Sequence, residues 1–411
     1  MTRSTATQTA PFAQQASELL NRLRIAYAAL LREACGTGGR AVDLQRALNL
    51  DMKISWKVAR VAGAPTPLAA GPYVPGPANA RSIVKAGRRK GLDATLLDTL
   101  EADMAAFERF VKRCAGDRNT FDSMIYSLSP SQEAELFSLN QRKAAFRANR
   151  HLYGSVAQVQ STMIFIQPTA DRPELVDFAL VQGHHGLQRL REDAPLPRAA
   201  AGVRDDAFQL AGTGSPIPGD ENVGPALLQE FCTQPLPPFE ATREVNGRVS
   251  GRLVTPDIGM QAAVDWFSGV VLRAAAPRWK AENNTQGIMR AEAWTPCESF
   301  YLTLLIHRET YGPLTPGLVL LRDPTASLPD ANEDRRLDHV LTAREQVQSL
   351  GRGPGVLHSP DLPRQGELAA YMLNRLGWES ADFDVYQIRF EYPVTPSTVF
   401  MVYDLPEAPS T

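Results

Sequence analysis

The sequence predicts an α+β protein of more than one domain, and three observations support this prediction. The chain has 411 residues, enough for two or three domains of ordinary size. Helical periodicity dominates residues 12–157, whereas apolar runs typical of strands appear beyond residue 157. The two parts also differ in charge, because residues 1–150 carry a net charge of +9 and residues 151–411 one of −11. We therefore expect a basic helical N-terminal part and an acidic α+β C-terminal part.

The composition is that of an ordinary globular chain. Hydrophobic residues make up 44% of the sequence and charged residues 21%, so a large core can form without a metal or a disulfide. The four cysteines are scattered without a C-x-x-C pair, which favours reduced thiols. Residues 1–11 lack the apolar segment of a secretory signal and are expected to be a disordered tail. No apolar run approaches about 18 residues, so we expect a soluble, cytoplasmic protein without a membrane partner.

The N-terminal part is predicted to consist of helices separated by glycine and proline breaks. Apolar residues recur at helical spacing, and the prolines from Pro65 to Pro77 predict a linker or a rigid loop. The predicted helices cover residues 12–34, 42–48, 52–62, 79–90, 92–114 and 131–157.

The C-terminal part is predicted to hold an at least partly antiparallel sheet together with helices. Residues 386–392 alternate apolar and polar side chains, and a turn at 393–396 leads to a second strand at 399–403, so we expect these two strands to pair. Residues 194–225 are expected to be loop-like and poorly ordered. Further strands are predicted at 161–167, 176–182 and 300–306, and helices at 261–275 and 365–376.

Residues 42–61 carry the pattern with the clearest functional content. A short helix ends at Leu48, and Asn49 stands where a tight turn needs a left-handed residue. Leu50 can fill the gap between the two helices, and Asp51 is a good N-cap for the helix that follows. The pattern predicts two short helices joined by a tight turn.

The second of these helices separates apolar and basic side chains. At 3.6 residues per turn, Ile54, Val58 and Val61 share one face. A stripe of three cations, Lys53, Lys57 and Arg60, lies roughly 100° away from that face. One face can pack against the rest of the domain while the other meets an anionic partner.

This stretch resembles the helix-turn-helix of bacterial transcriptional regulators over about residues 42–61. Gln45 and Ser55 stand where that family usually has a small apolar residue and an Ile or Val inside its helices. The resemblance implies that double-stranded DNA is the partner and that the second helix enters its major groove. With it, we divide the chain into the tail (1–11), a helix-turn-helix domain (12–91), connecting or dimerisation helices (92–157) and an α+β sensor or interaction domain (158–411).

The local charge extends the predicted DNA-binding surface beyond the second helix. Residues 40–92 contain ten basic and two acidic residues, and a cluster from Lys85 to Lys90 offers a second phosphate contact. The alternative is an ordinary helical hairpin with a solvated basic face. The predicted DNA-binding residues are Arg46, Lys53, Ser55, Lys57, Arg60, Lys85, Arg88, Arg89 and Lys90.

No catalytic, cofactor-binding or metal-ligating set is predicted. Adjacent side chains on a strand point to opposite faces, so His184 and His185 are not expected to share a metal ion. A buried strand between Cys297 and His307 would separate them by about 30 Å, too far for a nucleophilic pair. We therefore expect no catalytic residues, no cofactor and no metal.

The predicted function is DNA-binding transcriptional regulation, with a C-terminal domain that binds a small-molecule effector or a partner. A homodimer is expected through the apolar stripe of residues 92–114, although this stripe would serve equally well to pack within its own chain. An enzyme with its active site in the C-terminal domain and a protein-binding scaffold remain as alternatives. The stripe consists of Leu96, Leu97, Leu100, Met104, Phe107 and Val111.

Overall fold

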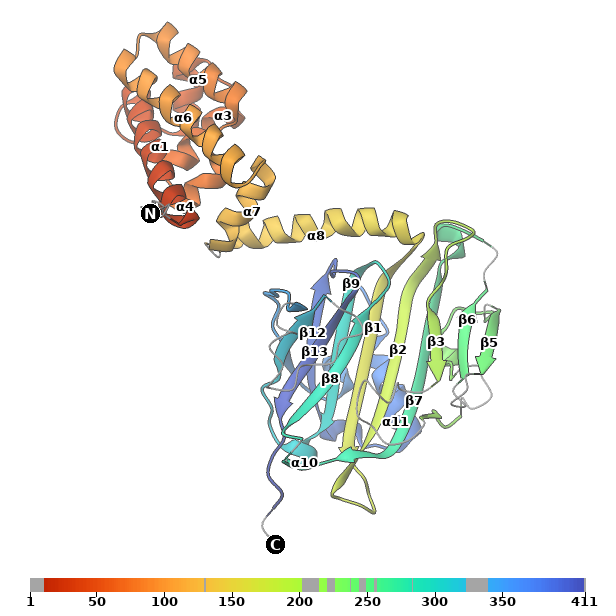
Figure 1. Cartoon of the computed structure of the whole chain (residues 1–411). Coiled ribbons are helices and arrows are strands. Elements are labelled where there is room, and N and C mark those ends of the chain that lie inside the picture. The colour runs from red at the N-terminus through yellow and green to blue at the C-terminus, as the bar shows by residue number, and fades with distance from the viewer. Residues whose placement is uncertain are drawn as a thin grey trace, which may run out of the picture. The chain divides into compact units, whose positions relative to one another are not determined.

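The computed structural model divides the chain into two compact units, which we call unit 1 (Met1–Ser138) and unit 2 (Leu139–Thr411) and describe separately (Figure 1). The fold is α+β overall, with a mixed sheet in which most neighbouring strands are antiparallel. Among the described helices, none is long and apolar enough to cross a lipid bilayer. The structure describes residues 11–128, 131–201, 214–219, 226–236, 238–243, 249–254, 257–282, 284–322 and 339–409.

Unit 1 is helical throughout its described residues, as its apolar periodicity predicts. The division from unit 2 falls within α8 (Gln132–Tyr153). The elements before α8 are α1 (Phe12–Cys35), α2 (Ala41–Leu48), α3 (Met52–Ala62), α4 (Pro67–Ala70), η1 (Gly71–Tyr73), α5 (Pro77–Lys90), α6 (Ala94–Cys114) and α7 (Arg118–Leu128). The long helices α1 and α6 pack against each other, and α3 packs against α1 and α2.

The apolar stripe of α6 lies in the core of its own unit. Leu97, Leu100, Met104 and Phe107 are almost completely buried, in one cluster with side chains of α1 and α5. Val111 is buried in the same cluster, and Leu96 packs against it. This stripe is therefore not available as a dimer surface, and the prediction that placed a dimer contact on it is wrong.

The proline-rich segment between α3 and α5 is a folded part of unit 1. Its residues form α4 and η1, where Thr66 caps α4 by accepting a hydrogen bond from the Ala69 amide at 3.3 Å. The guanidinium of Arg118 donates to the carbonyl oxygens of Gly71, Pro72 and Val74, each at 2.8 Å. Since these carbonyls have a fixed partner, the segment is a rigid loop and not a linker.

Unit 2 is built on a seven-stranded sheet with the order β11-β12-β9-β1-β2-β7-β4. β1 and β9 are parallel, and the other neighbours in this sheet are antiparallel. Its strands are β1 (Ser155–Pro168), β2 (Leu175–Arg189), β4 (Ser215–Pro216), β7 (Val264–Pro277), β9 (Cys297–His307), β11 (Gln348–Arg352) and β12 (Phe383–Glu391).

Two three-stranded sheets and a few helices complete unit 2. One sheet has the order β10-β13-β8 and the other β3-β6-β5. Their strands are β10 (Gly317–Leu321), β13 (Ser397–Asp404), β8 (Gln286–Ala293), β3 (Arg198–Ala201), β6 (Val249–Leu253) and β5 (Phe239–Arg243). The helices are α10 (Arg308–Tyr311), α11 (Gln365–Leu376), η2 (Gln229–Phe231), η3 (Met260–Ala262), η5 (Pro354–Val356) and η6 (Ser380–Asp382).

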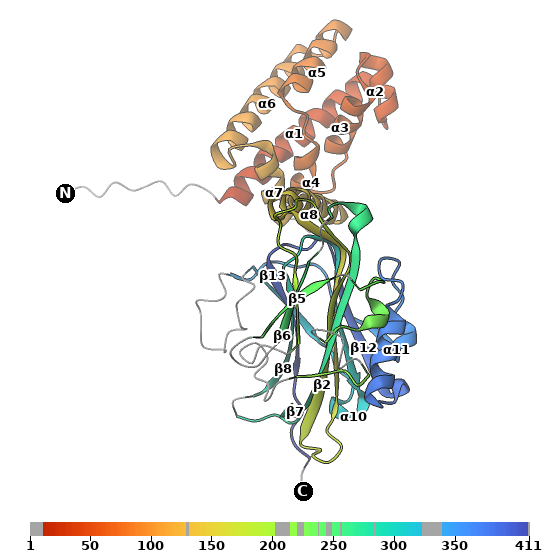
Figure 2. The same ribbon diagram turned by 90° about the vertical axis from the view of Figure 1, so that its right-hand side faces the viewer.

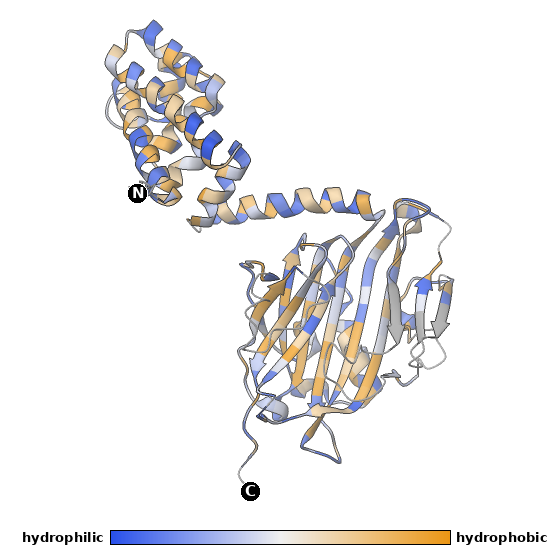
Figure 3. Cartoon of the chain, in the orientation of Figure 1, coloured by the Kyte–Doolittle hydropathy of each residue, from blue (hydrophilic) through white to orange (hydrophobic). Residues whose placement is uncertain are grey.

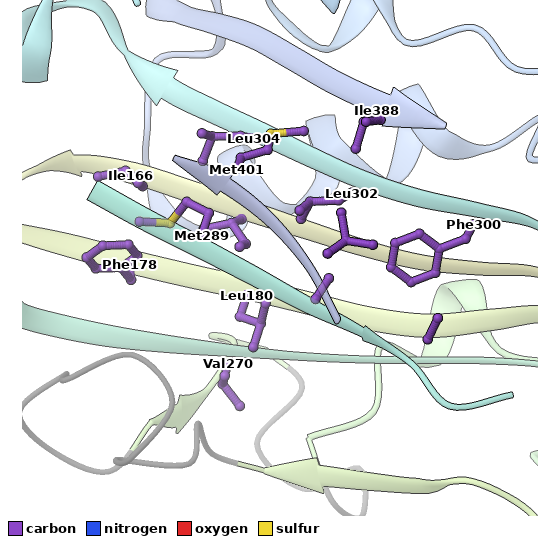
Figure 4. Close-up of a cluster of buried hydrophobic side chains, with 14 of the residues drawn as sticks. Ile166, Phe178, Leu180, Val270, Met289, Phe300, Leu302, Leu304, Ile388 and Met401 are labelled. Atoms are coloured by element: carbon purple, nitrogen blue, oxygen red, sulfur yellow. The ribbon is translucent and has the colours of Figure 1, made fainter. Parts of the chain in front are cut away.

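The seven-stranded sheet is buried on both faces. One face packs against the β10-β13-β8 sheet, where Leu180 and Leu302 meet Met289 and Met401 (Figure 4). The other face packs against α11, which lies on the opposite side of the sheet from β8 and β13 (Figure 2). Hydrophobic residues consequently occupy most of the length of the central strands (Figure 3). Successive side chains of one strand, such as Ile164 and Phe165, enter different cores.

Two sequence expectations for unit 2 are wrong. Residues 261–275, predicted as a helix, lie largely in strand β7, whose Trp266 and Phe267 point into the two cores on opposite faces. The two C-terminal strands do not pair with each other, because the turn at 393–396 carries the chain from β12 in the seven-stranded sheet to β13 in the second sheet. The expectation of poor order over 194–225 falls partly outside the described residues, as does that for residues 1–11.

Candidate nucleic-acid interface

The turn between α2 and α3 has the geometry that its sequence predicts. Asn49 ends α2 in the left-handed region, with φ 50° and ψ 49°. Leu50 is buried beneath the two helices at 9% exposure. Asp51 caps α3, because its Oδ1 accepts a hydrogen bond from the Lys53 amide at 2.7 Å. The two helices therefore meet in a tight turn held by local interactions.

The inner face of α3 differs from the prediction at one residue. Val58 and Val61 are fully buried in the core of unit 1, and Ile54 packs against that core. Ser55 is also fully buried, and its hydroxyl has no hydrogen-bond partner among the described residues. Ser55 stands where the resemblance to helix-turn-helix proteins leads us to expect an interior Ile or Val. It cannot contact DNA, and its assignment to the interface is wrong.

The outer face of α3 carries exposed apolar and basic side chains together. Met52 and Trp56 are 41% and 45% exposed, and Lys53 is exposed beside them without an ion pair in the described part of the chain. Lys57 is half-buried at the edge of this face. Its pKa is lowered from the ordinary value by burial and by the positive charges of Arg118 and Lys53. The helix thus presents one free cation, Lys53, and one partly packed cation, Lys57.

Arg60 lies on the outer face of α3 but is held by residues of unit 1. Its Nη2 donates to the Tyr73 hydroxyl at 2.7 Å and to Oε1 of Glu133 at 2.9 Å. Its guanidinium also lies over the Tyr73 ring, with Cζ 4.5 Å from the centroid, and Tyr73 makes an edge contact with Trp56. The side chains of Arg60 and Glu133 are 44% and 46% exposed, so the ion pair is open to solvent.

Helix α5 presents the most continuous row of cations in unit 1. Arg81, Lys85 and Arg89 recur at i, i+4 and i+8, all are exposed, and no ion pair holds them among the described residues. Lys90 is exposed at the end of the helix, and Arg46 is exposed on α2. Sequence analysis missed Arg81, although its spacing of four residues from Lys85 was a sufficient signal.

Arg88 differs from the other cations of α5 because it faces α6. Its Nη2 lies 2.9 Å from Oδ1 of Asp98 and 2.8 Å from Oε2 of Glu101. Hydrogen bonding to Asp98 and the charge of Glu101 raise the pKa of Arg88 above its ordinary value. Arg88 therefore ties two helices together and is a weaker candidate for a phosphate contact than its neighbours.

A cleft of about 550 Å³ lies beside Arg60 within unit 1. Its lining combines apolar residues with the Arg60–Glu133 pair and two tyrosines. Sequence analysis missed this cleft because its walls come from segments far apart in the sequence. The lining residues are Ala59, Arg60, Gly63, Ala64, Pro65, Thr66, Leu68, Ala69, Pro72, Tyr73, Ile125, Tyr126, Ser131 and Glu133.

The most concentrated polar cluster of unit 2 surrounds Asp361. Its Oδ2 accepts hydrogen bonds from Ser299 at 2.8 Å, from Tyr301 at 3.1 Å and from Nη2 of Arg389 at 2.6 Å. Burial alone would raise the pKa of Asp361, but these hydrogen bonds and the charge of Arg389 lower it on balance. The carboxylate is satisfied by its own chain, so the cluster fastens the segment before α11 to the sheet.

The histidines and cysteines of unit 2 lie as their strand positions predict. His184 is buried, which lowers its pKa to about 4, and its Nε2 has no hydrogen-bond partner among the described residues. His185 points to the other face of β2, where its Nδ1 lies 2.8 Å from Oδ1 of Asp265. Cys297 is buried at the opposite end of β9 from His307. In the described part of the chain, no group of three or more His, Cys, Asp or Glu side chains has the geometry to hold a metal ion.

Comparison with known proteins adds no family to these observations. No protein-family model matches the chain, and no curated protein matches its sequence at a significant level.

Proposed function

We propose that the protein is a DNA-binding transcriptional regulator whose unit 1 binds double-stranded DNA through α3 and α5. The observation that carries this proposal is a capped second helix after a tight left-handed turn, with the exposed cation Lys53 on it and a row of exposed cations on α5 that have no acidic partner among the described residues. Such a helix fits the major groove, which is about 12 Å wide. The proposal includes the resemblance to bacterial helix-turn-helix regulators and a cytoplasmic location.

The outer face of α3 suits base recognition better than phosphate contact alone. Lys53 can reach guanine edges or phosphates, and the exposed apolar side chains of Met52 and Trp56 can contact thymine methyl groups or sugars. Arg60 can join this surface when Glu133 releases it, because both side chains already face solvent.

The row on α5 suits the DNA backbone. Three cations stand one helical turn apart, and no acidic side chain among the described residues neutralises them. They can therefore pair with the phosphates of a DNA strand and strengthen its binding. Phosphate contacts of this kind fix position and orientation but read no sequence. In this proposal, α5 therefore supplies affinity and α3 supplies specificity.

Unit 2 is proposed to bind a ligand or a partner, and homodimerisation is proposed to bring two copies of α3 to neighbouring half-sites. The dimer contact has to lie elsewhere than on the α6 stripe, since that stripe is buried in unit 1. The Asp361 cluster of unit 2 is satisfied internally and does not favour a particular reaction.

The test uses the full chain and a pool of random duplex DNA from which bound sequences are selected. We expect enrichment of a defined motif, and Lys53→Ala to lower affinity for that motif by about 1–3 kcal/mol while the melting temperature stays the same. Arg172→Ala, at an exposed arginine between β1 and β2 in unit 2, is the matched control and should leave binding unchanged. If no sequence is enriched, or if Lys53→Ala and Arg172→Ala behave alike, α3 is not a recognition helix.

A further inference from the structure

The cleft beside Arg60 contains the elements of a binding site for a small organic acid. Its lining includes the apolar side chains of Leu68, Ala69 and Ile125. The lining also includes Arg60, whose guanidinium already holds a carboxylate, that of Glu133. A cleft of about 550 Å³ is in the ordinary size range for a small-molecule site, which commonly combines apolar walls with a few polar groups.

The position of Glu133 shows that Arg60 and Tyr73 together can bind a carboxylate. Its Oε1 receives hydrogen bonds from Nη2 of Arg60 at 2.9 Å and from the Tyr73 hydroxyl at 3.4 Å. The Tyr126 hydroxyl also lines the cleft and has no hydrogen-bond partner among the described residues. Because Glu133 is 46% exposed, displacing its carboxylate into water costs little free energy.

We propose that this cleft binds a small carboxylic acid with an apolar body, whose carboxylate replaces that of Glu133 on Arg60 and Tyr73. The apolar body lies against Leu68, Ala69 and Ile125. Since Arg60 also stands on the outer face of α3, the bound acid and a DNA phosphate compete for one guanidinium. This regulatory step rests on the proposed function, whereas binding of the acid does not.

The binding test titrates the full chain by calorimetry with benzoate, 3-phenylpropanoate and indole-3-acetate, each paired with its neutral amide. At least one acid should bind, and its amide should bind roughly tenfold or more weakly, because a charge-assisted hydrogen bond is lost. Arg60→Ala should weaken binding of the acid to a similar extent, and Glu133→Gln should strengthen it by removing the internal competitor.

The matched controls are Arg88→Ala and Glu101→Gln, which break an exposed arginine–carboxylate pair outside the cleft. Neither should change the affinity for the acid. Circular dichroism melts of all four variants establish that each is folded. If no acid binds better than its amide, or if Arg60→Ala binds the acid as the wild type does, the proposal is overturned.

The regulatory step is tested separately with the selected DNA motif. The acid that binds should lower DNA affinity in the wild type but not in Arg60→Ala. If the acid binds and DNA affinity stays constant, the cleft is a ligand site without the proposed competition. If the acid binds and no DNA is bound under any condition, the proposed function fails while the ligand site stands.

Discussion

The cations of α5 in unit 1 and the paired arginines of the sheet in unit 2 are arranged differently. On α5 of unit 1, Arg81, Lys85 and Arg89 are exposed without an ion pair among the described residues. In unit 2, Arg273 meets Asp177 and Arg389 meets Asp361, at 2.8 and 2.6 Å. The first arrangement leaves positive charge for an external anion, whereas the second uses it to hold strands and loops together. Charge composition alone does not distinguish these two uses, because both units are rich in arginine.

The two arrangements also differ in how far they can be predicted from the sequence. The spacing of cations along a helix can be read from the sequence, but whether an acid holds each of them cannot, as Arg60 and Arg88 show. A cation that is held in an ion pair can be recognised only when the acid beside it has been located, and that acid often lies far away in the sequence, as Asp177 does from Arg273. Removal of charge should therefore affect binding in unit 1 and stability in unit 2.

The largest effect is expected for the cations of α5. Alanine at Arg81, Lys85 and Arg89 together should lower the salt slope of binding to random duplex DNA by about 2.7, because each phosphate contact contributes about 0.9. Affinity near 0.15 M salt should fall roughly a hundredfold in consequence. Anisotropy titrations across a range of salt concentrations measure both quantities.

The melting temperature of this triple variant should remain that of the wild type, because the three side chains have no intramolecular partner to lose. The charge-preserving double variant Arg81→Lys with Arg89→Lys, which leaves Lys85 in place, serves as the control and should keep the salt slope. A loss of stability without a change in the salt slope would mean that the α5 cations hold the fold together, as the ion-paired arginines of unit 2 do. The proposed difference between the two sets of cations would then be wrong.

A second large effect concerns the buried histidine of unit 2. His184 has a pKa of about 4 in the folded chain, against an ordinary value of 6.5, because burial disfavours its charged form. The unfolded chain therefore takes up the proton first as the pH falls. Stability should decrease by about 3 kcal/mol between pH values of about 6.5 and 4, and His184 should contribute no pH dependence above this range.

Denaturant melts of the wild type and of His184→Gln over this pH range test the prediction. The glutamine variant should lose less stability on acidification, whatever its stability at neutral pH. A histidine on the same strand, His185, supplies the control. Its pKa is raised by the hydrogen bond to Asp265, so its contribution is present at low pH and is lost as the pH rises through its folded value. Equal acid sensitivity of the wild type and His184→Gln would contradict the assignment.

The helices of unit 1 could be predicted from the sequence because each has one buried face. The helix at 52–62, its Asp51 cap and the left-handed Asn49 all follow from local pattern. Strand β7 could not be predicted in this way. It is buried on both faces, so its apolar residues form a nearly continuous run that does not distinguish a strand from a buried helix.

The candidate sites also differ in whether local sequence pattern can predict them. Lys53 and the α5 cations follow from helical spacing, whereas the cleft needs Tyr73, Tyr126 and Glu133 to be brought to Arg60 by the fold. Ser55 is predicted at the interface with its neighbour Lys53, but the two side chains lie on different faces of α3, and Ser55 is in the core.

A moderate effect is expected for the Asp361 cluster. Arg389→Ala removes two hydrogen bonds to the carboxylate, from Nε at 3.0 Å and Nη2 at 2.6 Å. We expect a loss of about 1–3 kcal/mol in the free energy of unfolding, measured by denaturant melts. DNA affinity should be unchanged, in contrast to the triple variant of α5. Arg172→Ala is the exposed control, and a neutral outcome for Arg389→Ala would show that unit 2 does not depend on its internal ion pairs.

The smallest effect is expected at Ser55. It is a buried polar group without a partner in the described part of the chain, a feature that both units contain. Its hydroxyl is fully buried and has no hydrogen-bond partner among the described residues, as is true of Nε2 of His184 in unit 2. A buried polar group without a partner is destabilising, and alanine fits the space that serine leaves. Ser55→Ala should therefore raise the free energy of unfolding by up to about 1 kcal/mol and leave DNA affinity unchanged. A variant that loses DNA affinity while it stays folded would place the hydroxyl at the interface after all, and α3 would have to be turned relative to the core described above.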